Sequence, residues 1–172
     1  MNLTWITPAL AIGGSLRDAE AARLAETGVG AVVDLRSEAV DERSLLEAQG
    51  IAFLHLPTDD HAVVTPAHLD EGVAFVAAQR EAGRRVLIHC EHGIGRSATL
   101  ALAAMVEAGL APIEALTLAK DRRDRVSPSP AQYVGWRDWL QTHRIRTGAT
   151  WAIPDFDSFA AIAYRHLNGG AS

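Results

Sequence analysis

Residues 85–107 read RVLIHCEHGIGRSATLALAAMVE. The run 85–89 is mostly apolar and follows Gly83, which is typical of a buried strand. The run 97–107 repeats apolar side chains at helical spacing, and a short loop with two glycines lies between the two runs. A strand, a tight loop and a helix in this order favour an anion site, because the first amides of a helix lack internal partners and carry the positive end of its dipole.

The loop carries the groups that hold a phosphate. Its glycines allow the backbone to adopt unusual angles and to approach a ligand closely, and successive loop amides form a nest for an anion. Arg96 stands at the start of the helix, where its guanidinium can hold two phosphate oxygens at once. The predicted phosphate-binding residues are Glu91, His92, Gly93, Ile94, Gly95 and Arg96.

Cys90 is the only cysteine among 172 residues, so it forms no disulfide within the chain and is a candidate for reactivity. Amides that bind phosphate also stabilise a thiolate, and a thiolate below a bound phosphate is placed for in-line attack on phosphorus. Arg96 and the amides then stabilise the charge on the equatorial oxygens. The hydroxyl of Ser97 can donate to the sulfur and ease its departure, and it can also cap the helix. His89 is predicted to be a buried side chain that orients the loop.

The pattern of His-Cys, five residues and then Arg-Ser resembles the signature of the protein tyrosine phosphatase superfamily, and above all that of its small dual-specificity phosphatases. The resemblance covers about residues 3–143. Four further stretches are similar to segments of that family: 5–14, 33–36, 56–60, and Arg122 with 127–130. Asp34 and Arg36, in the second of these, are candidates to brace the loop.

The resemblance implies a general acid on a loop about thirty residues before the cysteine. Asp59 and Asp60 both fit by position. We favour Asp60, because a short loop then leads to the helix-starting Pro66, whereas Asp59 is expected to accept backbone hydrogen bonds. Gln132 is a weaker candidate, for positioning the water that hydrolyses the intermediate.

Short apolar runs alternate with amphipathic stretches along the whole chain, which predicts an α/β fold. We expect a central, mostly parallel sheet of four to five strands flanked by helices, as in cysteine phosphatases. Pro57 is expected to end the strand that begins near Ile51. The length favours one domain over residues 1–172, with residues 144–172 as a C-terminal extension that carries a helix near 156–167.

Composition limits the partners. The net charge of -5 argues against a general nucleic-acid surface. No apolar run is long enough to span a bilayer, and the first residues lack the pattern of a signal peptide, so we expect a cytoplasmic protein without a membrane partner. The scheme above needs no cofactor and no metal. The sequence leaves the oligomeric state open.

The expected function is hydrolysis of phosphomonoesters through a phospho-cysteine. The substrate is a phosphoprotein or a small phosphate ester, with phosphotyrosine first and phosphoserine or phosphothreonine next. Two alternatives remain open: a non-protein ester such as a phosphoinositide, and a module that binds phosphate without turning it over. A rhodanese-like sulfurtransferase is disfavoured by the glycine pattern, by the Arg-Ser pair and by the upstream acid.

Overall fold

The computed structural model describes residues 1–168. A five-stranded sheet forms its centre. The strands are β1 (Leu3–Thr7), β2 (Leu10–Gly13), β3 (Val29–Arg36), β4 (Ala52–Thr58) and β5 (Arg85–His89). Their spatial order is β1-β2-β5-β3-β4, with only the β1–β2 pair antiparallel. The predicted α/β fold with a mostly parallel sheet is therefore confirmed.

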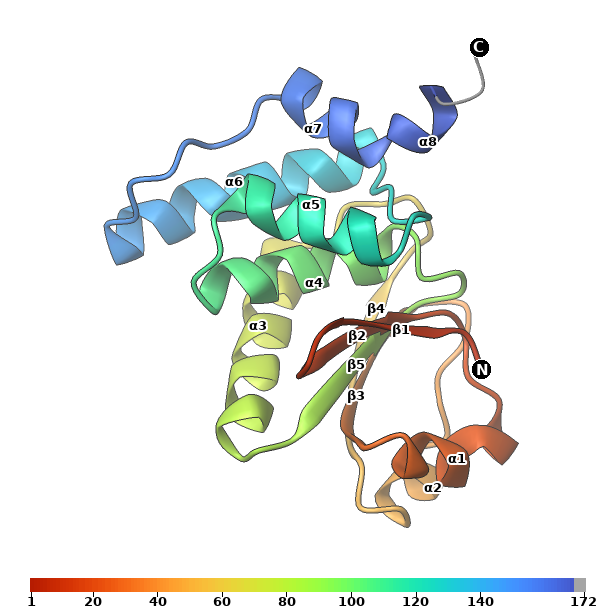
Figure 1. Ribbon diagram of the computed structural model, residues 1–172. Coiled ribbons are helices and arrows are strands. Elements are labelled where there is room, and N and C mark those ends of the chain that lie inside the picture. The colour runs from red at the N-terminus through yellow and green to blue at the C-terminus, as the bar shows by residue number, and fades with distance from the viewer. Residues whose placement is uncertain (169–172) are drawn as a thin grey trace.

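Helices cover both faces of the sheet (Figure 1). One face carries α3, α4, α5 and α6, while the short 3-10 helix η1 with α1 and α2 covers the other. The helices run as follows: η1 (Asp18–Glu20), α1 (Ala21–Glu26), α2 (Arg43–Glu47), α3 (Pro66–Glu81), α4 (Arg96–Glu107), α5 (Pro112–Arg122), α6 (Pro130–Thr147), α7 (Phe156–Ala163) and α8 (Arg165–Asn168).

The central strand β5 shows how the sheet divides the core. Successive side chains of a strand point to opposite faces. Val86 and Ile88 therefore join the large core under α3 to α6, and Leu87 joins the small core under α1 and α2. Since β5 lies between β2 and β3, its carboxyl end opens among the ends of neighbouring strands, which is where ligands bind in open α/β sheets. The loop over residues 90–95, which we call the phosphate loop after its predicted role, begins at this end.

Two expected boundaries differ from the structure. Pro57 does not end β4, which continues to Thr58. The strand lies at the edge of the sheet, and a proline is tolerated there because its missing N–H is not needed by a second neighbour. The C-terminal helix is broken at Tyr164 into α7 and α8. Residues 169–172 of the predicted extension lie outside the described residues.

Among the residues that the structure describes, no helix combines the length and the hydrophobicity that crossing a bilayer demands.

Candidate active site

The phosphate loop requires glycine at two positions, as predicted. Gly93 has a φ of +67°, and a Cβ there would lie 2.6 Å from both the Gly13 carbonyl oxygen and the Arg123 guanidinium. At Gly95 a Cβ would lie 2.5 Å from Oε1 of Gln132. A side chain at Gly93 would force the loop away from the Gly13 backbone, while one at Gly95 would displace the end of the Gln132 side chain.

Arg123, directly after α5, holds the loop from behind. Its guanidinium donates to the carbonyl oxygens of His92 and Gly93, at 3.0 and 2.8 Å. It also donates to the side chains of Asn2 and Thr4, both at 3.0 Å. Burial lowers the pKa of Arg123, but the group stays charged because an arginine ordinarily titrates far above neutral pH. These two carbonyl oxygens thus point toward Arg123, away from the concave side of the loop where amides are predicted to bind an anion.

Cys90 and Ser97 meet at the floor of the loop. The thiol is almost fully buried, and its Sγ lies 3.3 Å from the Ser97 hydroxyl oxygen. Cys90 follows β5 and Ser97 lies in the first turn of α4, so the strand and the helix bring the two side chains together. Their predicted roles as nucleophile and as donor to the sulfur stay predictions, and the structure brings the two groups within contact.

His89 belongs to a buried polar network behind the loop. Its Nε2 lies 2.6 Å from an Asp41 carboxylate oxygen, and Asp41 accepts from Arg36 at 2.8 Å. Arg36 also donates twice to Asp34, each time at 3.0 Å. Burial by itself raises the Asp34 pKa, but the hydrogen bonds from Arg36 and the nearby His89 hold this pKa below its ordinary value. The network fixes the ring of His89, as expected for an orienting residue.

The three ligand-type side chains of that network, Asp34, Asp41 and His89, lie within 4.8 Å of one another. Both carboxylates, those of Asp34 and Asp41, form ion pairs with Arg36. We therefore interpret the three residues as a support of the loop.

Arg96 is 1% exposed and held by a partner that the sequence did not suggest. Its two terminal nitrogens donate to the two carboxylate oxygens of Glu38, both at 2.8 Å, and one of them also donates to the Thr58 carbonyl at 2.8 Å. The hydrogen bond to Arg96 lowers the pKa of Glu38 to about 2. Nε of Arg96 is buried without a hydrogen-bond partner among the described residues, and such a donor is costly unless a ligand satisfies it.

The two candidate acids separate clearly. Asp60 lines the cleft above Cys90, and its Oδ1 lies 3.6 Å from Nε of Arg96. The carboxylate of Asp59 instead accepts a hydrogen bond of 2.6 Å from Ser37. The expected backbone partner of Asp59 is thus replaced by a hydroxyl, but the geometry still favours Asp60 as the acid.

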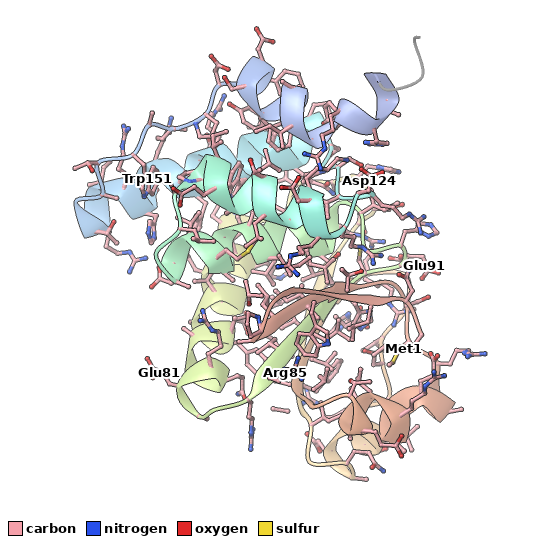
Figure 2. The ribbon with its side chains drawn as sticks, in the orientation of Figure 1. Met1, Glu81, Arg85, Glu91, Asp124 and Trp151 are labelled. Atoms are coloured by element: carbon pink, nitrogen blue, oxygen red, sulfur yellow. The ribbon has the colours of Figure 1, made fainter. Side chains whose placement is uncertain are left out.

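The remaining predicted residues take different places. Glu91 turns away from the cleft toward Ser15 and Arg36, at 3.4 and 3.6 Å. Gln132 is buried, and its Oε1 accepts from the Ser129 amide at 2.9 Å. Figure 2 labels Glu91 and Asp124 on the same side of the molecule, where the phosphate loop and the end of α5 meet.

The cleft has a volume of about 450 Å³. It is lined by Asp60, His61, Cys90, His92, Ile94, Gly95, Ser127, Ser129, Pro130, Gln132, Tyr164 and Leu167. A larger cavity, of about 550 Å³, lies around Arg80 and Glu81, and Figure 2 places Glu81 at the opposite end of the molecule. No cysteine, serine or threonine among the described residues lines that cavity, whereas the smaller cleft contains the Cys90 thiol.

Sequence reasoning missed several of these residues. The family resemblance points to Arg122 in the segment after the loop, but its side chain is exposed, and its neighbour Arg123 makes the contacts. Glu38 carried one available signal, an acid directly after the strand of Asp34 and Arg36. Tyr164 and Leu167 carried none, because only packing brings the C-terminal segment to the cleft.

Comparison with known proteins decides the family. A family model described as "Dual specificity phosphatase, catalytic domain" matches residues 13–140. The chain belongs to this family. Dual specificity protein phosphatase 12 of Mus musculus is 34% identical over 99 residues, which are 57% of this chain and 29% of that protein. Dual specificity protein phosphatase 2 of Mus musculus is 29% identical over 126 residues, 72% of this chain and 38% of that protein. The chain thus spans about a third of the length of these curated relatives.

Solved structures of the dual specificity and tyrosine phosphatases share the fold. The structure described as "Crystal structure of Tk-PTP in the active form" is 26% identical with a TM-score of 0.75, and the match covers 81% of this chain and 97% of that one. The crystal structure of human DUSP28 is 25% identical with a TM-score of 0.75, and the match covers 84% of this chain and 100% of that one. The resemblance read from the sequence is confirmed.

Proposed function

We propose that this member of the dual specificity phosphatase family is a cysteine-dependent phosphomonoester hydrolase. The observation that carries the proposal is the alignment of three groups around one anion site. The Cys90 sulfur lies at its floor, the unpartnered Nε of Arg96 is buried beside it, and the Asp60 carboxyl lies 3.6 Å from that nitrogen.

In the first step, the Cys90 thiolate attacks the phosphorus of the bound ester. The S–P bond forms while the bond between phosphorus and the ester oxygen breaks. Asp60, in its protonated form, gives its proton to the leaving oxygen, so that an alcohol or phenol departs. Arg96 Nε and the loop amides stabilise the charge on the equatorial oxygens. The product is a phospho-cysteine.

In the second step, water attacks the phosphorus of the phospho-cysteine. Asp60, now ionised, accepts a proton from this water as the S–P bond breaks. Ser97, 3.3 Å from the sulfur, donates to the departing thiolate, and inorganic phosphate is released. Gln132 lines the cleft with its Oε1 accepting from the Ser129 amide, and its side-chain amide is the group that positions the water.

The substrates we propose are phosphotyrosine first, with phosphoserine and phosphothreonine next. One observation keeps phosphoinositides as a second candidate. A glutamate in the phosphate loop would repel a polyanionic head group, but the Glu91 carboxylate faces Arg36 and Ser15 instead of the cleft. A non-catalytic module is disfavoured because cysteine, arginine and acid are all in place.

The test is hydrolysis of an aryl phosphate by the wild-type protein and by Cys90→Ser, with chelator present, from pH ~4 to pH ~9. We expect a bell-shaped rate profile for the wild type, no turnover by the variant, and retained binding of inorganic phosphate by both. If a folded wild-type protein with a reduced thiol shows no turnover, the hydrolase proposal fails and the phosphate-binding module takes its place.

A further inference from the structure

The phosphate cleft extends beyond the part of the chain that matches the family. The match ends at residue 140, yet Tyr164 and Leu167 line the same cleft as Cys90. Figure 1 shows the C-terminal helices α7 and α8 on the outer side of α5 and α6. A segment outside the matched domain therefore supplies part of the wall of the site.

The first half of this segment is anchored in the core. Phe159 of α7 is fully buried, and the centroid of its ring lies 4.8 Å from that of Tyr133 on α6. The Tyr133 hydroxyl in turn donates to the Pro154 carbonyl at 2.7 Å, just before α7. At the break between α7 and α8, the Tyr164 hydroxyl donates to the Pro128 carbonyl at 2.5 Å. This last contact ties the segment to the loop that borders the cleft.

The second half, α8, is held by polar contacts to α5. Arg165 pairs with Asp121 at 2.7 Å. The buried Lys120 amine lies 2.7 Å from Nδ1 of His166. Leu167 follows these two residues, and its position at the cleft is set by them. A wall fixed in this way meets a ligand without a large cost for ordering its own side chains.

The two walls of the cleft differ in chemistry. Asp60 is a charged part of the lining, and Glu38, which is not among the lining residues, holds Arg96 through an ion pair. The part of the lining that the C-terminal segment supplies, Leu167 and the Tyr164 ring, is apolar, and Leu167 is 71% exposed. Covering an exposed aliphatic side chain with an apolar group is favourable, because it removes apolar surface from water.

We propose that residues 155–167 form a substrate-recognition element, in which Leu167 and the Tyr164 ring contact an apolar group bonded to the ester oxygen, such as a phenyl ring. The proposal rests on the hydrolysis proposed above, since attack by Cys90 places the phosphorus at the floor of the cleft. The ester group then points toward the mouth and passes this wall. Each methylene that the contact removes from water should raise the affinity for the substrate roughly fourfold.

A binding experiment tests the wall separately from turnover. In a Cys90→Ser background, calorimetry compares phenyl phosphate with inorganic phosphate for the parent, for Leu167→Ala and for Ile145→Ala. Ile145 is the matched control, an aliphatic side chain of α6 that is 84% exposed and lies outside the cleft. We expect Leu167→Ala to weaken phenyl phosphate about three- to tenfold and to leave inorganic phosphate unchanged. We expect Ile145→Ala to change neither dissociation constant.

Unchanged affinity of Leu167→Ala for phenyl phosphate would overturn the proposal. An equal loss for both ligands would overturn it too, because the effect would then lie in the phosphate loop. Leu167→Met, which keeps the apolar volume, should bind phenyl phosphate like the parent. With an intact Cys90, the Leu167→Ala change should appear in KM for an aryl phosphate and not in kcat. A wild-type protein that turns over no ester but retains the binding difference would refute the hydrolase alone.

Discussion

The two walls of the cleft come from different parts of the chain and have different chemistry. Asp60, which lines the cleft, follows β4, and Glu38, which holds Arg96, follows β3. Both strands lie on the same side of β5 in the sheet, so the polar wall is a direct product of the parallel sheet. The apolar wall, with Tyr164 and Leu167, comes from helices packed on the outside of the domain. In the proposed mechanism the difference separates two tasks: the polar wall binds charge and transfers protons, while the apolar wall contacts the part of the substrate that does not react.

The largest effect is expected from removing Asp60, the proposed proton donor of the polar wall. Asp60→Asn should lower kcat by roughly 10²- to 10⁴-fold for an ester with a poor leaving group, because the departing alkoxide then lacks a proton. The loss should be smaller for nitrophenyl phosphate, whose leaving group needs little protonation. Steady-state kinetics with both esters checks this.

Asp59→Asn is the matched control for that variant, since it changes the neighbouring carboxylate, which binds Ser37. Its kcat should stay within about threefold of the wild type. Equal losses of kcat in the two variants would contradict the assignment of different roles to the two aspartates. A loss of kcat confined to Asp59→Asn would assign the general-acid role to Asp59.

The next effect is expected behind the loop. Arg123→Met removes the buried donor from the carbonyls of His92 and Gly93. Because buried acceptors left without donors are costly, unfolding free energy should fall by about 3 kcal/mol. The inhibition constant of inorganic phosphate should rise about tenfold as the loop loses its shape.

Urea denaturation and phosphate inhibition measure the two consequences of Arg123→Met. Arg122→Met, at the exposed neighbouring arginine, should leave both close to the wild type. If both variants behaved alike, the loop would not depend on the guanidinium behind it.

The smallest effect is expected at Glu38, whose side chain is 43% exposed. Glu38→Gln removes the ion pair with Arg96 and should raise KM several-fold with little change in kcat. The pair also makes stability depend on pH. The folded pKa, about 2, lies below the ordinary 4.5, so the pair stabilises the fold fully above that ordinary value and progressively less as the pH falls toward 2.

Chemical denaturation of the wild type and of Glu38→Gln, from neutral pH to about pH 3, follows this dependence. The advantage of the wild type should be constant near neutral pH and should shrink in acid. An advantage that grew in acid would contradict the assigned direction of the pKa shift.

Local patterns predicted the elements with strong signals. The strand 85–89 has the expected bounds, and α3 begins at Pro66 as expected, because apolar runs, glycines and helix-starting prolines act within a few residues. Cys90, Ser97 and the two loop glycines were predicted for the same reason, since their chemistry lies in one continuous segment. The Pro57 boundary was wrong because the sequence does not say that β4 lies at an edge.

The sequence by itself determined the phosphate loop, because a nucleophile, two glycines, an arginine and a serine within eight residues need only a strand before them and a helix after them. Only the tertiary structure decided what surrounds this loop. Arg123, Glu38 and Leu167 lie 33, 52 and 77 positions from Cys90 along the chain, by subtraction of residue numbers. Their contacts with the site depend on strand order and on helix packing, and these follow from burial of the whole core, which no local pattern encodes.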